Sequence, residues 1–135
     1  MSLGRVLVVD DEENVRKMVR MTLSKAGFDV VDAADGEKGI QAIKSGDNPL
    51  LVDAIFCDIH MPKVNGMEAI AYFRQQFPSV PVVVITGQPD VQKATLLFKQ
   101  GVVDYLVKPV EAAKLVEVAK KAVKDHELFK DQFKV

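Results

Sequence analysis

The stretch IFCDIHMPKVNG, residues 55–66, begins as a buried strand would and then stops at a carboxylate, Asp58. Its first residues, IFC, end a mostly apolar run over residues 52–57. Short apolar runs of this kind are typical of a strand that is covered on both faces of a parallel sheet. In open sheets of this kind, ligands bind beyond the carboxyl ends of the strands. The position of Asp58 therefore predicts a functional carboxylate at the edge of a sheet.

Four further runs rich in Val and Ile resemble this one. The five predicted strands cover residues 5–9, 28–33, 52–57, 81–86 and 103–107. Segments of helical period separate them, and strands that alternate with helices predict crossover units and a parallel sheet with helices on both faces. The predicted fold class is α/β, a doubly wound five-stranded parallel sheet.

Capping residues and helix breakers bound the predicted helices. The first carries an apolar face from Val15 to Ala26 and stops at Gly27, and the second starts at Asp35 as N-cap and ends before the segment SGDNP. The third follows Asn65 as N-cap and ends at the two prolines of FPSVP. The fourth runs from near Pro89 to Gly101, and the fifth from about residue 111 nearly to the C-terminus.

Bulk composition excludes several function classes. The chain has 135 residues, enough for one domain, and its net charge is -1, which provides no cationic field for nucleic acid or anionic membrane. The single cysteine, Cys57, allows no intrachain disulfide and is expected to be a small buried apolar residue. No signal peptide or membrane-spanning run is recognisable, so we expect a cytoplasmic location.

Charged and polar residues follow four of the five strands directly. They are Asp10 and Asp11 after the first strand, Asp58 after the third, Thr86 with Gly87 at the fourth, and Lys108 with Pro109 at the fifth. Each has an ordinary role by itself: an aspartate before a helix is often an N-cap, one at a loop start often forms an Asx turn, and Lys-Pro is often a solvated turn. Their joint occurrence at one sheet edge favours a site.

Three neighbouring carboxylates repel each other unless one is protonated or a cation is bound. Oxygen ligands at this charge density suit a hard cation such as Mg²⁺ or Mn²⁺. Lys108 adds a positive charge and Thr86 a donor, which together suit a phosphoryl group. The set therefore predicts that Asp58 is a nucleophile that becomes an aspartyl phosphate.

These motifs resemble the receiver domain of bacterial two-component response regulators. The matching segments are VLVVDDE (6–12), FCDIHMPKVNG (56–66), VVVITG (82–87) and DYLVKP (104–109). The resemblance covers residues 5 to about 125 and implies a flavodoxin-like fold with strand order 2-1-3-4-5.

The resemblance implies a role for each carboxylate of the site. Asp58 would accept a phosphoryl group from a histidine kinase or a histidine phosphotransfer protein. Asp11 and Asp58 would bind the metal ion directly, Asp10 would act mainly through water, and the backbone carbonyl of His60 would complete the ligands. The chain itself would then be a phosphoacceptor switch that transfers and loses its own phosphoryl group, without acting as an enzyme on other substrates.

The resemblance also implies switch residues. Thr86 would hydrogen-bond the phosphoryl group and move toward it, Tyr105 would change rotamer behind it, and Lys108 would pair with a phosphoryl oxygen. The Lys108–Pro109 peptide bond is expected to be cis. A strand-end tyrosine packed at the rim is the simpler interpretation of Tyr105. His60 and Gln88 occupy positions that vary in this family and tune the lifetime of the phosphoryl group.

The C-terminal helix extends past a minimal receiver. We expect a receiver domain over residues 1–125 and a helical extension, or the start of a linker to an output domain, over 126–135. Six residues follow heptad spacing: Leu115, Ala119, Ala122, His126, Phe129 and Phe133. This seam allows a homodimer or an output domain or effector as partner, and His126 is expected on an exposed helix face.

Two other functions are alternatives to a phosphoacceptor switch. A phosphatase of small substrates that proceeds through an aspartyl phosphate would present a second acid two residues after the nucleophile, where this chain has His60. A flavodoxin-like binder of nucleotide or flavin would need a Gly-rich phosphate loop after the first strand, where this chain has Asp10 and Asp11. A receiver that has lost phosphorylation would lack part of the acidic and basic set, which is complete here.

Overall fold

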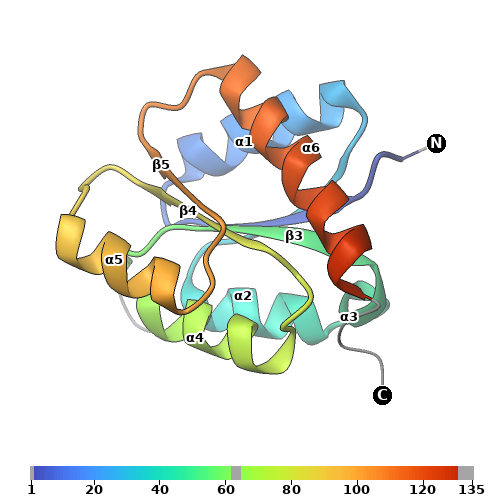
Figure 1. Ribbon diagram of the computed structural model, residues 1–135. Coiled ribbons are helices and arrows are strands. Elements are labelled where there is room, and N and C mark those ends of the chain that lie inside the picture. The colour runs from blue at the N-terminus through green and yellow to red at the C-terminus, as the bar shows by residue number, and fades with distance from the viewer. Residues whose placement is uncertain (1, 62–64, 131–135) are drawn as a thin grey trace.

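Five parallel strands form one sheet in the computed structural model, which describes residues 2–61 and 65–130 (Figure 1). The strands are β1 (Arg5–Val9), β2 (Asp29–Ala33), β3 (Val52–Cys57), β4 (Val82–Thr86) and β5 (Asp104–Val107). Their order across the sheet is β2-β1-β3-β4-β5, and every neighbouring pair is parallel. The predicted α/β class and strand order are confirmed.

Helices cover both faces of this sheet (Figure 1). They are α1 (Glu13–Ala26), α2 (Gly36–Lys44), α3 (Asn48–Leu51), α4 (Gly66–Gln76), α5 (Val91–Lys99) and α6 (Ala112–Phe129). Helices α1 and α6 lie together on one face, while α2, α4 and α5 lie on the other. Among the described residues, no helix is both long and apolar enough to span a bilayer.

The central strands carry a hydrophobic core on each face. Along β1, Val6 and Val8 are buried against α1 and α6, whereas Leu7 and Val9 are buried against α2 and α4. Successive side chains of a strand point to opposite faces, so a strand between two helical layers must be apolar throughout. The unbroken apolar run of β1 is therefore a consequence of the two layers.

Side-chain caps start α2, α4 and α5 where the sequence places them, with one shift. Asp35 accepts a hydrogen bond from the Lys38 backbone N–H, and Asn65 accepts one from the Glu68 backbone N–H, as predicted. Helix α5 starts at Val91 instead of near Pro89, because Asp90 is its N-cap. The proline precedes the helix, where its missing N–H has no cost.

Helix α3 is not predicted from the sequence. The sequence predicts that the segment SGDNP interrupts helical structure, yet Asn48–Leu51 form one helical turn with a proline in its first positions. Pro49 has a backbone conformation suited to a first turn, so the segment that follows α2 begins another helix. The Asn48 side chain donates to the Ala42 carbonyl and ties this turn to the end of α2.

His126 is buried, so its expected exposure on α6 is wrong. Its Nδ1 lies 2.8 Å from Asp53 Oδ1, at the amino end of β3. Burial alone would raise the pKa of Asp53, but hydrogen bonds from His126 and from the Arg5 backbone N–H more than offset this, and the pKa is lowered. A polar residue at a core position of the helix is accommodated because it has a partly buried hydrogen-bond partner.

The heptad pattern of α6 is explained largely by this packing. Leu115, Ala119 and Ala122 are buried against the sheet and α1, and His126 continues the same face. Phe133 lies outside the described residues. Contact with the sheet therefore accounts for the first four positions of the seam without a second chain.

Candidate functional site

The sheet hydrogen bonds continue into the acidic residues at its carboxyl edge. The Asp10 backbone N–H donates to the Ala33 carbonyl at 3.1 Å, and the Asp58 backbone N–H donates to the Val9 carbonyl at 2.9 Å. Both aspartates are therefore positioned by β1 and its two neighbouring strands. Because β1 and β3 are adjacent, residues after them in the chain become neighbours in space.

Four carboxylates gather at this edge. Asp10, Asp11, Glu12 and Asp58 each offer one oxygen, and these oxygens all lie within 4.8 Å of one another. Asp10 and Asp58 are buried, while Asp11 and Glu12 face solvent. Carboxylates that converge in this way suit a hard divalent cation, which takes oxygen ligands and keeps several waters. The cluster could therefore hold a metal ion.

Lys108 supplies the opposing charge. Its Nζ lies 2.9 Å from Asp10 Oδ2, 3.0 Å from Glu12 Oε1 and 3.2 Å from Asp58 Oδ2. Burial alone would lower the pKa of Lys108, but the three carboxylates more than offset this and raise the pKa. The ammonium therefore stays charged over the whole physiological pH range. The Lys108–Pro109 peptide bond is cis.

Asp10 has the least favourable environment of the four acids. Its side chain is fully buried, and burial raises the pKa of the carboxyl although Lys108 and the Glu12 backbone N–H act in the opposite direction. Within the described residues, Asp10 Oδ2 is close to Lys108 but accepts no hydrogen bond of ordinary geometry. A buried, incompletely paired carboxylate oxygen fits a position that a cation or its bound water would complete.

The loop after β3 holds the Asp58 carboxylate. Asp58 Oδ1 accepts a hydrogen bond from the His60 backbone N–H at 3.0 Å, so the carboxylate is oriented by the chain that follows it. The loop returns to α4 at Gly66, whose Cα lies so close to the Asp58 carbonyl that no Cβ would fit. Pro62, which the sequence motif assigns to the same turn, lies outside the described residues.

Thr86 and His60 both bind the loop between β4 and α5. The Thr86 hydroxyl accepts a hydrogen bond from the Gln88 backbone N–H at 3.1 Å, and His60 Nε2 lies 3.1 Å from the Gln88 carbonyl oxygen. In the part of the chain that the structure describes, no hydrogen bond joins Thr86 to Asp58. The backbone of Gln88 is thus held from two sides.

Tyr105 binds the same loop two residues further along the chain, at Asp90. Its hydroxyl accepts a hydrogen bond from the Asp90 backbone N–H at 3.2 Å, and its ring packs beside Phe98 with centroids 6.5 Å apart. Asp90 is the N-cap of α5. The start of α5 is therefore tied to β5 through Tyr105.

Two residues that contact the site, Glu12 and Arg16, are not predicted from the sequence. Glu12 pairs with Lys108, and the Arg16 guanidinium donates to the Asp10 carbonyl at 2.7 Å while its Nε lies 3.4 Å from Asp32. Glu12 directly follows the two predicted metal-binding aspartates, so adjacency is a signal that could have found it. Arg16 has no comparable signal, because its contact depends on how α1 leaves the sheet.

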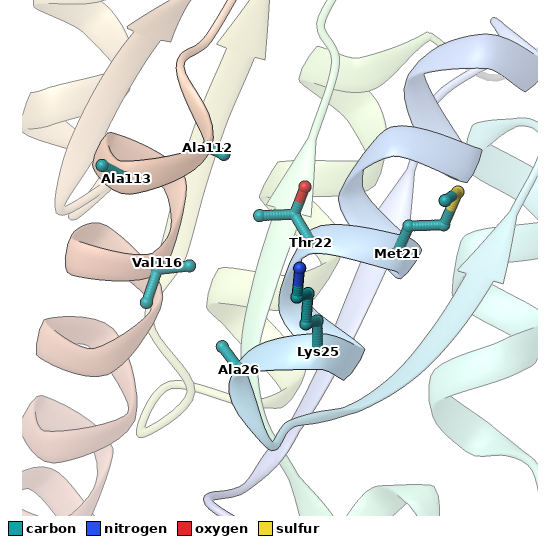
Figure 2. A pocket seen from close by; sticks show the side chains of 7 residues that line it. All are labelled: Met21, Thr22, Lys25, Ala26, Ala112, Ala113 and Val116. Carbon is teal, nitrogen blue, oxygen red and sulfur yellow. The ribbon is translucent and has the colours of Figure 1, made fainter.

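A shallow groove between α1 and α6 adds no chemistry to the site. Met21, Lys25 and Val116 are among its lining residues, and the lining is mostly apolar or small (Figure 2). It contains none of the four clustered acids.

Cys57 is fully buried, as predicted, and burial raises the pKa of its thiol, which keeps it protonated.

The fold and the acidic edge together define a flavodoxin-like α/β protein with a site suited to a metal ion and a phosphoryl group. The family profile of the response regulator receiver domain matches residues 6–120. The chain therefore belongs to the response regulator receiver domain family.

Known relatives agree with this assignment. The chemotaxis protein CheY of Listeria monocytogenes is 32% identical over 120 residues, which are 89% of this chain and 98% of that protein. A solved response regulator receiver domain from Clostridium thermocellum superimposes with a TM-score of 0.85 at 29% identity, covering 93% of this chain and 98% of that one.

Longer relatives contain the same segment. The DNA-binding transcriptional regulator NtrC of Escherichia coli K12 is 29% identical over 127 residues, which are 94% of this chain. The match spans 26% of NtrC, so this chain corresponds to about a quarter of that protein.

Proposed function

We propose that the chain is a phosphorylation-controlled switch whose phosphoacceptor is Asp58. The observation that carries the proposal is the position of the Lys108 ammonium, 3.2 Å from Asp58 and 2.9 Å from Asp10, beside a cluster of carboxylates. A cation-binding edge next to a fixed ammonium provides positive charge on two sides of one carboxylate. This arrangement suits transfer of a phosphoryl dianion.

The transfer is a displacement at phosphorus. An Asp58 carboxylate oxygen forms a bond to the phosphorus of a phosphohistidine on a histidine kinase or a histidine phosphotransfer protein. The P–N bond breaks, and its electron pair returns to the imidazole nitrogen of the donor. The product is an aspartyl phosphate on this chain and a free histidine on the donor.

A divalent ion at the acidic edge would offset charge on the phosphoryl oxygens. Asp11 and Asp58 would hold Mg²⁺ or Mn²⁺ directly, together with the His60 carbonyl, and Asp10 would act mainly through water. The partly unpaired Asp10 oxygen and the all-oxygen donor set support this fit. Lys108 would pair with a phosphoryl oxygen, for which its charge is already assured.

The switch would run through the loop between β4 and α5. Thr86 holds the Gln88 backbone N–H and Tyr105 holds the Asp90 backbone N–H. If the Thr86 hydroxyl turns to donate to a phosphoryl group, its bond to Gln88 weakens and the loop is freed to move. Tyr105 would then change rotamer, and the surface formed by α5, β5 and α6 would change. His60 and Gln88, in mutual contact, would tune the phosphoryl lifetime.

A changed surface implies a partner whose binding depends on it. We propose that residues 1–125 form the receiver and that 126–135 extend it toward an output domain or a separate effector. Self-directed transfer and autodephosphorylation would be its only chemistry, and a homodimer is a further means of output. The burial of His126 supports a helix that continues the receiver past the end of the family match at residue 120.

Incubation with acetyl phosphate and Mg²⁺, followed by intact-mass spectrometry, tests the proposal. We expect wild type to gain one phosphoryl group and Asp58→Asn to gain none. Asp29→Asn, the same change at an exposed acid at the start of β2, is the matched control and should label like wild type. Labelling of Asp58→Asn at the wild-type rate would refute the assignment, and steady turnover of p-nitrophenyl phosphate would favour the phosphatase instead.

A further inference from the structure

We infer that Glu12 is a positioning residue that holds Lys108 and competes with the incoming phosphoryl group for it. Glu12 has no role in the proposed phosphoryl transfer, yet its carboxylate is one of the three partners of the Lys108 ammonium. The inference rests on the proposed function, because it concerns the same phosphoryl transfer to Asp58.

The ammonium of Lys108 already has three carboxylate neighbours before any donor arrives. Its Nζ donates hydrogen bonds to Glu12 Oε1 at 3.0 Å and to Asp58 Oδ2 at 3.2 Å, and Asp10 Oδ2 lies 2.9 Å away without a hydrogen bond of ordinary geometry. A phosphoryl oxygen that pairs with this group therefore competes with these carboxylates for the same positive charge. The choice of which partner leaves decides how readily the transfer begins.

Exposure identifies the partner that leaves. The side chains of Asp10 and Asp58 are 0% and 4% exposed, so neither carboxylate can turn into water without opening the core. The Glu12 side chain is 59% exposed and its carboxylate can be solvated as soon as it releases Lys108. Glu12 is therefore the displaceable partner, and the other two stay in place.

The backbone of Glu12 is held independently of its side chain. Its N–H donates to Asp10 Oδ1 at 2.9 Å, and it precedes α1 as N-cap without a side-chain capping bond. The carboxylate is therefore free of any structural hydrogen bond in the described residues except the pair with Lys108. Replacing Glu12 by glutamine removes its charge and leaves the start of α1 intact.

The charge of Glu12 opposes the donor in two ways. It occupies an N–H of Lys108 that the phosphoryl oxygen needs, and it repels an anion approaching the open side of the site. Both effects grow with the negative charge of the donor and shrink as salt screens exposed charges. Glu12 thus slows phosphorylation by small anionic donors while it keeps Lys108 in place between transfers.

The test compares rates of phosphorylation at Asp58 by two donors at saturating Mg²⁺. At neutral pH, where the rates are compared, acetyl phosphate is a dianion and phosphoramidate is mainly a monoanion. Glu12→Gln should be phosphorylated faster than wild type by acetyl phosphate, by about two- to fivefold, which corresponds to a partly exposed ion pair. The gain should be smaller with phosphoramidate, and it should shrink between about 0.02 and 0.5 M ionic strength.

Two further variants separate competition for Lys108 from a general effect of net charge. Glu13→Gln removes the same charge one residue along, at the exposed first position of α1, and should change the rate less than Glu12→Gln does. Glu12→Asp keeps the charge on a shorter side chain and should lie between Glu12→Gln and wild type. If net charge alone set the rate, Glu13→Gln would be as fast as Glu12→Gln, and that result would overturn the inference.

Other outcomes distinguish the inference from the proposed function. If Glu12→Gln is no faster than wild type, or gains equally with both donors, Glu12 does not compete for Lys108. If the variant needs more Mg²⁺ for half-maximal labelling, Glu12 is a metal ligand and the inference is wrong, although phosphorylation of Asp58 still stands. Absence of labelling in wild type would overturn both.

Discussion

Gly66 lies against the backbone of the loop that holds Asp58, and replacing it by alanine should separate α4 from that loop. A Cβ at this position would meet the Asp58 carbonyl oxygen and the Ile59 Cα well inside van der Waals contact, and the Asp58 carbonyl carbon at 2.7 Å. These atoms belong to the main chain, which cannot rotate away as a side chain would. The first turn of α4 would have to move.

The cost follows from what this movement disturbs. Overfilling a packed site typically costs about 1–3 kcal/mol, and an obstacle made of backbone places this substitution at the upper end, about 3 kcal/mol. The shift would also strain the cap that Asn65 forms with the Glu68 backbone N–H at 3.0 Å. Gly66 itself is buried, so the methyl group has no path into solvent.

Urea unfolding followed by circular dichroism measures this cost. A denaturant slope of about 2 kcal/mol per M for a domain of this size converts about 3 kcal/mol into a midpoint lower by about 1.5 M. The control is Gly87→Ala on the other side of the site, where the nearest atom to the new methyl group is Lys108 Cδ at 3.7 Å. That variant should stay within about 0.5 kcal/mol of wild type.

Two outcomes would contradict a steric role for Gly66. If Gly66→Ala unfolds within about 0.5 kcal/mol of wild type, the close approach of α4 to the Asp58 carbonyl is not a constraint on the fold. Equal losses of unfolding free energy in Gly66→Ala and Gly87→Ala would show that replacing a glycine by alanine has this effect in general. Gly66→Ala should also label more slowly at Asp58, because the carboxylate moves with its backbone.

The remaining predictions concern two acids, the buried Asp10 and the partly buried Asp53. Because burial raises the pKa of Asp10 in the folded protein, the stability that its protonated form contributes is present below the unfolded pKa of about 3.9 and lost as pH rises through the folded value. Asp10→Asn should therefore melt about 2–5 °C higher at pH 7 by calorimetry, with the gain shrinking toward acid. An unchanged or lower melting temperature at pH 7 would contradict this. The pKa of Asp53 is lowered, so its effect on stability has the opposite pH dependence. The stability that its charged form contributes is present above about pH 3.9 and is lost as pH falls through the lower pKa of the folded protein. Asp53→Asn, which leaves buried His126 without its charged partner, should lose about 1–2 kcal/mol at pH 7 in urea unfolding. The loss should shrink below about pH 4, and a pH-independent loss would point to packing alone.

The local sequence determines most of the architecture. Unbroken apolar runs such as residues 6–9 specify strands covered on both faces, and Gly27, Asp35 and Asn65 mark helix ends through conformations and hydrogen bonds that involve only neighbouring residues. The alternation of these elements then restricts the connections to right-handed crossovers. Strand order is less local, and predicting it requires the resemblance to receiver domains.

Contacts between distant segments could not be obtained in the same way. Asp53 and His126 are 73 positions apart, and each is an ordinary residue in its own segment; the register of α6 on the sheet makes them a partly buried pair. Glu12 and Lys108 are 96 positions apart, and their contact exists because β1 and β5 end at the same edge of the sheet. Residue type and spacing predict which groups reach that edge. Which carboxylate is buried, which faces water and which one the ammonium can release depend on packing in three dimensions.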